Sequence, residues 1–174
     1  MNLNNFTIKA QEAVAHSQQI AFNNKNSNME TEHLLKSLLS DEDSPIEFLL
    51  KKNNVNVNFV DTKLNESISK LPKTESGEPA QMISREMNNV ILRAGADLKK
   101  FGDEFVSVEH LLLALLQGND NTAKILKDAG LNEKGLVAAI KDLRKGSTIS
   151  SQTQETQFNA LNKYAKNLNE MARQ

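Results

Sequence analysis

Two Glu-His pairs are the residues of this chain whose types and spacing could do chemistry. Glu32 precedes His33 in the stretch "TEHLL", and Glu109 precedes His110 in the stretch "VEHLL". Two imidazoles and two carboxylates could together hold a metal ion, and this is the one feature that supports an enzyme hypothesis. Metalloproteases that take ligands from one helix use the spacing H-E-x-x-H, which neither stretch has. The sequence therefore predicts no metal site.

The same four residues have two further interpretations, and both stay open at this point. In the structural one, each Glu lies in the first turn of a helix, where the helix dipole favours a carboxylate by roughly 0.3 to 1 kcal/mol. Each His then packs near the helix start, bonded to a loop carbonyl. In the functional one, Glu32 and Glu109 lie near a pseudo-twofold axis and offer an acidic rim to basic or modified side chains of a bound chain.

Composition excludes several other functions. The 174 residues include no Cys, so disulfides, thiol nucleophiles and zinc knuckles are impossible, and the net charge of -1 argues against nucleic-acid binding. Phosphate-loop, dinucleotide-binding and nucleophile-elbow motifs are absent. No apolar run reaches the roughly 18 residues of a membrane span, and the polar start lacks the core of a signal peptide. We expect a cytoplasmic protein that binds neither nucleic acid nor membrane.

An internal repeat explains why the "EHLL" motif occurs twice. His33 and His110 are 77 residues apart (110 − 33), and the same offset places Ala13-Val14 on Val90-Ile91. The chain is thus predicted to contain two copies of one unit, about residues 3–71 and 80–145.

Each unit is predicted to hold four helices, because apolar residues recur at three- and four-residue spacing. Ser44, Pro45 and Glu47 predict a capping box at the start of a helix. Single residues predict the other helix ends: Thr7, Ser84 and Ser107 as N-caps, and Gly130 and Gly146 at C-termini. No stretch alternates with period two, so the predicted fold is all-α, a tandem duplication of a four-helix unit with pseudo-twofold symmetry.

The end of the chain has a different composition from the two units. Residues 146–157, with the sequence "GSTISSQTQETQ", predict a flexible linker. Residues 158–174 place Phe158, Leu161, Tyr164, Leu168 and Met171 on one face of a predicted helix. That helix has no core of its own here, and we expect it to belong to a larger protein or to dock on a partner.

Four stretches together carry a resemblance to a known family. They read "FTIKAQEAV", "TEHLLKSLL", "GDEFVSVEHLLLALL" and "ALNKYAKNLNEMARQ". The whole chain resembles the N-terminal domain and following linker of the ClpB family of AAA+ protein disaggregases. The resemblance implies a Clp N-terminal double-repeat domain over residues 1–145, the linker, and at 158–174 the start of a helical segment leading to the first ATPase module.

The resemblance also implies a function. Such a domain engages exposed segments of unfolded or aggregated proteins and passes them to a hexameric ring, as part of a stress-response chaperone that refolds protein with a DnaK-type chaperone system. ATP and magnesium would belong to the ATPase modules of the full-length homo-hexamer. The chain itself is expected to be a monomer without catalytic activity or cofactor.

Six residues are the candidate substrate-binding positions. Four of them match positions linked to substrate binding in the family: Thr7, Ser84, Asp103 and Glu109. Helix capping alone would explain Thr7 and Ser84. Val108 is one of four apolar candidates, with Ile20, Leu92 and Leu98. Relatives often carry leucines where this chain has Arg93, Asp97 and His110, which predicts a more polar groove. Glu32 is the sixth position, and it is a candidate because of an alternative relative described next.

That alternative is a ClpC-type N-terminal domain, which receives adaptor proteins or chains marked with phosphoarginine. Its recognition acids lie in both "EH" motifs, and this chain has Glu32 as well as Glu109. A third class, a purely structural spacer, predicts no binding to unfolded chains at all.

Overall fold

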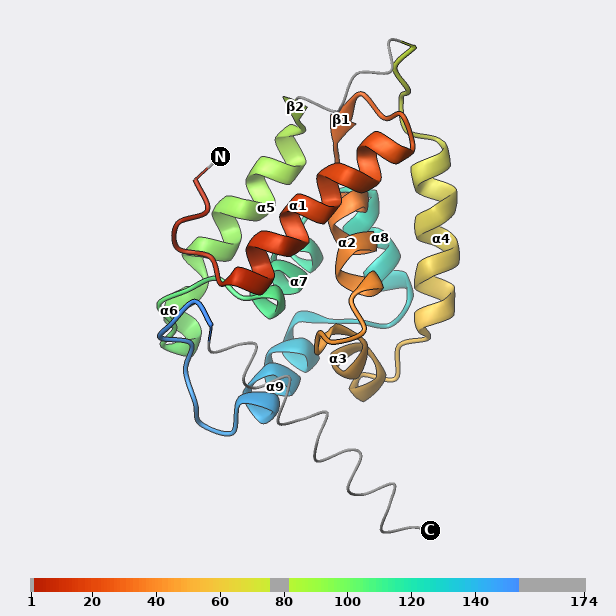
Figure 1. Ribbon diagram of the computed structural model, residues 1–174. Helices are drawn as coiled ribbons and strands as arrows, with labels where there is room; N and C mark the ends of the chain where they lie inside the picture. Colours follow the sequence, from red (N-terminus) through yellow and green to blue (C-terminus); the bar gives the residue numbers. More distant parts are fainter. Residues whose placement is uncertain (1, 76–81, 154–174) are drawn as a thin grey trace, which may run out of the picture.

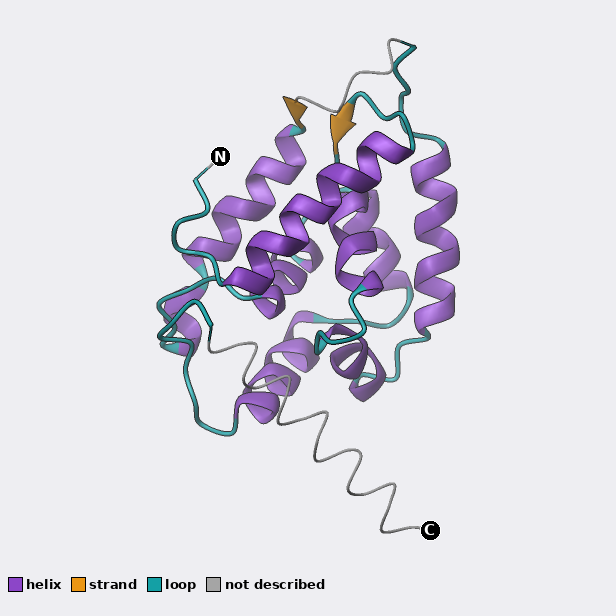
Figure 2. Cartoon of the chain, viewed as in Figure 1, coloured by secondary structure: helices purple, strands orange, loops and turns teal. Residues whose placement is uncertain are grey.

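The computed structural model describes residues 2–75 and 82–153 of the chain, and this part contains nine α-helices and two short strands (Figures 1 and 2). In the first unit they are α1 (Ile8–Asn23), β1 (Asn28–Met29), α2 (Thr31–Ser40), α3 (Ile46–Lys52) and α4 (Val57–Ser69). In the second they are β2 (Met82–Ile83), α5 (Arg85–Ala96), α6 (Leu98–Phe101), α7 (Val108–Leu116), α8 (Asn121–Asp128) and α9 (Glu133–Arg144). None of these helices is long and apolar enough to span a bilayer. The all-α fold is therefore as predicted.

Equivalent helices of the two units start in the same way. The Thr7 hydroxyl accepts a hydrogen bond from the Ala10 amide at the start of α1, and the Ser84 hydroxyl accepts one from the Met87 amide at the start of α5. Each bond satisfies one of the amides that a helix start leaves without an intrahelical partner. Thr7 and Ser84 are separated by the predicted offset (84 − 7 = 77), so both predicted N-caps are confirmed.

The helix packing repeats in pairs across the molecule. Helices α2 and α7 contact each other at the centre, α1 packs on α7 as α5 packs on α2, and α3 packs on α9 as α8 packs on α4. Figure 1 shows α4 and α5 on opposite flanks, with α1 crossing in front of α2 between them. All nine residues of α7 are buried, so this helix is the centre of one continuous apolar core. The paired contacts agree with the predicted pseudo-twofold arrangement.

Short parallel bridges join the two units. Phe6 pairs with Val106, and Met29 pairs with Ile83. The 77-residue offset makes Phe6 equivalent to Ile83 (6 + 77) and Met29 equivalent to Val106 (29 + 77). The second bridge therefore joins the same two positions as the first, with the two units interchanged. Each unit thereby supplies an extended residue beside the helix start of the other.

Two local predictions differ from the structure. Helix α3 begins at Ile46 with Pro45 as N-cap and no side-chain cap, so the capping box predicted at Ser44 and Glu47 is wrong. The Ser44 hydroxyl still accepts a hydrogen bond from the Ile46 amide at 3.4 Å, but the Ser44 amide donates to the Asp41 carbonyl, so Glu47 does not complete the box. In the second unit the first helix is interrupted at Asp97, and the short helix α6 follows with no separate counterpart in the first unit.

The segment after α9 lies against the domain. Residues 147–152 rise from the end of α9, past α6, to the start of α1, as the blue part of the ribbon in Figure 1 shows. For these residues the expected free linker is not what the structure shows, because Ile149 is fully buried and the backbone is hydrogen-bonded. The helix predicted over 158–174 and the remainder of the predicted linker lie outside the described residues.

Candidate functional site

The six candidate substrate-binding residues are all largely buried. Their exposed fractions run from 0% to 8%: Thr7 0%, Val108 2%, Glu109 2%, Glu32 6%, Ser84 8% and Asp103 8%. Neither Glu32 nor Glu109 therefore forms an exposed acidic rim. The structure brings Asp103 and Glu109 together in one polar cluster and places Glu32 in a second. Val108 belongs to the apolar core, whereas Leu92 is 65% exposed.

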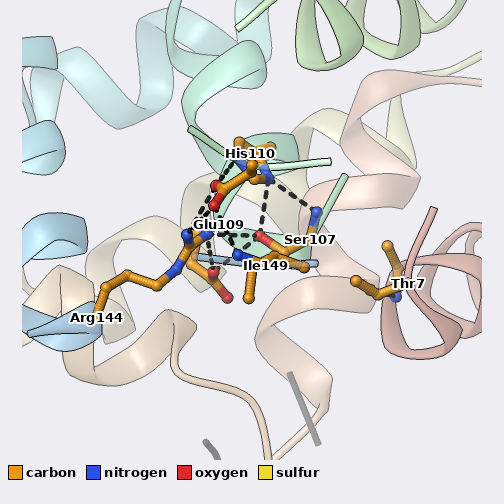
Figure 3. A network of polar contacts seen from close by, with 8 residues as sticks. Thr7, Ser107, Glu109, His110, Arg144 and Ile149 are labelled. Carbon is orange, nitrogen blue, oxygen red and sulfur yellow. Dashed lines mark hydrogen bonds and ion pairs between the residues drawn. The ribbon is translucent and has the colours of Figure 1, made fainter. Parts of the chain in front are cut away.

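Arg144, at the end of α9, is the centre of the first cluster, which comprises Asp103, Ser107, Glu109, His110 and Arg144 (Figure 3). Its Nη1 donates to both Asp103 oxygens at 2.8 and 2.7 Å, and its Nη2 donates to Glu109 Oε2 at 2.9 Å. The Ser107 hydroxyl donates to the same Glu109 oxygen at 2.8 Å. One guanidinium thus faces two buried carboxylates, and we call this set the Arg144 cluster.

The charges in the Arg144 cluster stabilise one another. Burial by itself raises the pKa of Asp103, but the contact with His110 and the hydrogen bonds from the Ile149 amide and Arg144, together with the charge of Arg144, bring the pKa below its ordinary value of 3.8. Burial likewise acts to lower the pKa of Arg144, and the neighbouring carboxylates outweigh it, so the pKa is raised. Both groups therefore stay ionised at neutral pH, which is what a buried pair requires.

The two histidines close the starts of α2 and α7. His33 Nδ1 accepts from the Glu30 amide at 2.9 Å, and His110 Nδ1 accepts from the Ser107 amide at 2.8 Å. The positions at helix starts are as predicted, but the bonded loop group is an amide and not a carbonyl. Because Nδ1 is an acceptor, the neutral rings carry their proton on Nε2.

The second nitrogen of each ring has a different partner. His33 Nε2 lies 2.8 Å from the amide oxygen of Asn26, and His110 Nε2 lies 2.8 Å from Asp103 Oδ2. Asn26 and Asp103 are equivalent by the offset (26 + 77 = 103). Both ring nitrogens of His33 are hydrogen-bonded, whereas His110 Nε2 faces the Asp103 carboxylate at ion-pair distance without hydrogen-bond geometry. No group of three or more His, Asp or Glu residues suited to a metal ion occurs in residues 2–75 and 82–153.

Glu32 is held by hydroxyl groups alone. The Thr122 hydroxyl donates to its Oε1 at 3.0 Å and the Ser67 hydroxyl to its Oε2 at 3.2 Å, while Thr31 lies 3.1 Å from Oε1. Within the described ranges no Lys or Arg forms an ion pair with Glu32. We call Thr31, Glu32, Ser67 and Thr122 the Glu32 cluster. It is the counterpart of the Arg144 cluster in the first unit, but its contacts to the Glu32 carboxylate come from hydroxyl groups and not from a cation.

More carboxylates lie next to the Glu32 cluster. Burial raises the pKa of Glu30, against a hydrogen bond from Ser84, and three further acids contribute in the same direction, namely Glu32, Glu86 and Asp120. Asp120 also accepts a hydrogen bond from the Thr31 hydroxyl at 2.8 Å. The neighbourhood of Glu32 is therefore negative.

A cavity opens onto Glu32 between α4 and α8. Its volume is about 560 Å³, and three lysines line it along with Phe59, Ser67 and Asn121: Lys63, Lys70 and Lys124. Glu66 and Asp128 line it as well as Glu32, so three carboxylates and three ammonium groups give the cavity a mixed character. It could receive a ligand that carries both a cation and an anion.

The three residues expected to give a more polar groove, Arg93, Asp97 and His110, make contacts within the domain. Arg93 Nη2 donates to the Ala114 carbonyl at 2.9 Å, Asp97 is only 9% exposed, and His110 is fully buried. They do not form an open polar groove.

Arg144 is the functional candidate that sequence reasoning missed. It lies on α9 four residues after Ile140 and eight after Leu136, both fully buried. At this spacing Arg144 belongs to the buried face of its helix. That spacing was the available signal, because a buried Arg requires carboxylate partners.

Comparisons with known proteins agree with this architecture. A family model described as the Clp repeat (R) N-terminal domain matches residues 5–129. The chain is 43% identical over 173 residues to the chaperone protein ClpB of Bacteroides thetaiotaomicron and 39% identical over 173 residues to ClpB of Porphyromonas gingivalis. Each match covers 99% of this chain and 20% of the relative, so the chain spans about one fifth of the length of these curated relatives.

Solved structures share the fold. The Hsp104 N-terminal domain from Candida albicans aligns with a TM-score of 0.76 at 21% identity, covering 87% of this chain and 99% of that one. The N-terminal domain of the caseinolytic protease associated chaperone ClpD from Arabidopsis thaliana aligns with a TM-score of 0.62 at 22% identity, covering 83% of this chain and 97% of that one. The fold predicted from the resemblance is thereby confirmed.

Proposed function

The chain belongs to the Clp repeat N-terminal domain family, and from this premise we propose that it is the substrate-engaging domain of a ClpB-like disaggregase. In this role it binds exposed segments of unfolded or aggregated proteins and passes them to the ring of the longer protein. The observation that carries the proposal is the 43% identity to a ClpB chaperone over 99% of the chain.

The surface suits weak binding of apolar segments. Six large apolar side chains are substantially exposed, at positions spread over both units: Ile8, Phe22, Phe48, Phe59, Met82 and Leu92. The chain has no Trp, which is a common anchor of tight interfaces. A domain that must release its substrate into a pore needs such weak contacts, and tethering to a ring supplies effective concentration in their place.

The remaining parts of the proposal concern the longer protein. ATP and magnesium are bound by ATPase modules, which assemble as a homo-hexamer and work with a DnaK-type chaperone system. The family model covers a domain that is not catalytic. The 174-residue chain should therefore neither bind nor hydrolyse ATP, and calorimetric titration with magnesium-ATP tests this directly.

An NMR titration tests substrate engagement. The isotope-labelled chain is titrated with a reduced and alkylated protein that stays unfolded, and with the same protein in its folded form. Chemical-shift changes seen with the unfolded form alone support the proposal. Equal changes with both forms would contradict selective engagement of unfolded protein, and no changes at millimolar concentration would favour a spacer.

The Glu32 cavity favours a second candidate, a ClpC-type domain for clients marked with phosphoarginine. A guanidinium would meet the unpaired Glu32 carboxylate, and the attached phosphate would meet Lys63, Lys70 or Lys124. Glu109 is already bound by Arg144, so one site per chain is expected. Free phosphoarginine should shift the signals around the cavity in the native chain and not in the Glu32→Gln variant. Absence of any shift would eliminate this candidate.

A further inference from the structure

The segment that follows α9 is bound by the domain in the manner of an extended peptide. The Ile149 amide donates to Asp103 Oδ1 at 2.8 Å, and the Ile149 carbonyl accepts from the Glu104 amide at 2.8 Å. Three residues later, the Gln152 carbonyl accepts from the Ile8 amide at 3.0 Å. We call residues 147–152 the strap.

One aliphatic side chain anchors the strap, and the Gln152 side-chain amide also donates to the Asn4 and Phe6 carbonyls at 3.1 and 3.4 Å. Ile149 is fully buried, while the adjacent Ser150 and Ser151 are exposed. Ile149 is also not part of the continuous apolar core of the two units, so it fills a separate socket beside Asp103 and Glu104. The combination of main-chain hydrogen bonds and one aliphatic anchor is a general mode of peptide recognition, and it depends little on the rest of the sequence.

The strap supplies hydrogen-bond partners to groups of the domain. The Ile8 amide is the first of helix α1, where no intrahelical carbonyl is available, and the strap supplies the acceptor. Asp103 Oδ1 accepts from the strap amide, while Arg144 and His110 contact the same carboxylate and fix it in place. The strap therefore lies along Asp103, Glu104 and the start of α1, with Asp103 fixed by the Arg144 cluster, and we call the place that it fills the strap groove.

We infer that this groove is a peptide-docking site which the strap occupies in cis, and that extended client segments with an aliphatic side chain compete with the strap for it. The inference rests on the proposed function and names the surface that carries it out. It also makes Asp103 a direct acceptor for the main chain of the bound segment and gives Glu109, which is 2% exposed and bonded to Arg144, a positioning role.

Three forms of the 174-residue chain test the strap: the native chain, Ile149→Asp and Ser151→Asp. The first substitution places a charge in the socket, and the second places the same charge on an exposed strap residue. Hydrogen exchange at the Ile8 and Glu104 amides should accelerate in Ile149→Asp alone. A peptide copying residues 146–153 should restore their protection, and the same peptide with Asp at the position of Ile149 should not. If the two amides exchange equally in all three proteins, the strap is not docked and the inference fails.

Client affinity tests the competition. A groove that the strap fills nine-tenths of the time weakens client binding about tenfold, so Ile149→Asp should bind the unfolded client about tenfold more tightly than the native chain. Ser151→Asp should match the native chain. Binding that is present but equal in all three proteins would overturn the inference and leave the proposed function standing. No binding by any of them would overturn both.

A second substitution protects the test against misfolding. If Ile149→Asp loses the helical circular-dichroism signal, Ile149→Ser replaces it, since serine empties the socket without adding a charge. The same gain in affinity is then expected, and its absence counts against the inference in the same way.

Discussion

Replacing Arg144 by methionine should destabilise the domain strongly. The change removes the guanidinium that bonds to both Asp103 and Glu109 and keeps a side chain of similar length. Arg144 is 4% exposed, and the two carboxylates are 8% and 2% exposed, so water cannot take its place. Removal of one partner from a buried ion pair costs about 3 to 5 kcal/mol, and we expect the free energy of unfolding to fall by that amount at pH 7.

The loss should depend on pH, and its sign follows from Asp103. In the native chain the pKa of Asp103 is lowered, so its contribution to stability is present above the ordinary value of 3.8 and is lost as the pH falls through the lower folded value. Without Arg144, burial dominates and the pKa of Asp103 rises. The variant then takes up a proton in mild acid, which removes the buried charge. The stability difference between the two proteins should shrink between pH 7 and pH 4.

Urea unfolding followed by circular dichroism measures both effects, because the chain has no Trp and one Tyr. Lys141→Met is the matched control: it removes an exposed cation one turn earlier on α9 and should change stability by less than about 0.5 kcal/mol. A loss below about 1 kcal/mol for Arg144→Met, or a difference that stays constant down to pH 4, would refute the account of the Arg144 cluster.

Three further predictions concern other parts of the domain. Burial lowers the pKa of His33 to about 4, so the folded state loses stability as the pH falls from 6.5 toward 4, by about 3 kcal/mol in total; an NMR titration of its ring protons should show the low pKa, and a value near 6.5 would contradict it. Thr7→Ala and Ser84→Ala should each cost about 1 kcal/mol in urea unfolding, whereas Thr7→Ser should retain the cap and most of the stability. Lys25 has a φ of 58°, so Lys25→Gly should stabilise the domain by about 0.5 to 1 kcal/mol, and a lower melting temperature would show this to be wrong.

Features that depend on local sequence were predictable. The caps at Thr7 and Ser84 and the buried stripe of α1 follow from residue types and helical spacing, and the structure has both. The motif at His33 and His110 correctly indicated helix starts. The capping box at Ser44 failed because its second half is missing: the Ser44 amide donates to the Asp41 carbonyl, and the Glu47 carboxylate pairs with Lys51 instead.

Features that depend on contacts between distant segments were not predictable. The polar composition of residues 146–157 indicated a flexible linker, but Ile149 and Gln152 bind the strap to Asp103, Glu104 and the segment before α1, all distant in sequence. The burial of Glu109 follows from Arg144, which lies 35 residues later on another helix. Equivalent positions of the two units also have different partners, because Glu32 has hydroxyl donors where Glu109 has a guanidinium.

The exchanged bridges have a consequence for how the molecule could be divided. The Thr7 amide donates to the Val106 carbonyl and the Ser84 amide donates to the Met29 carbonyl, so each half completes the backbone hydrogen bonding of the other. Helices α2 and α7 likewise bury each other. A chain cut between the two units keeps every one of these contacts. We therefore expect the two pieces to complement each other when they are expressed together and neither to fold alone, which would make this domain a natural starting point for a split reporter.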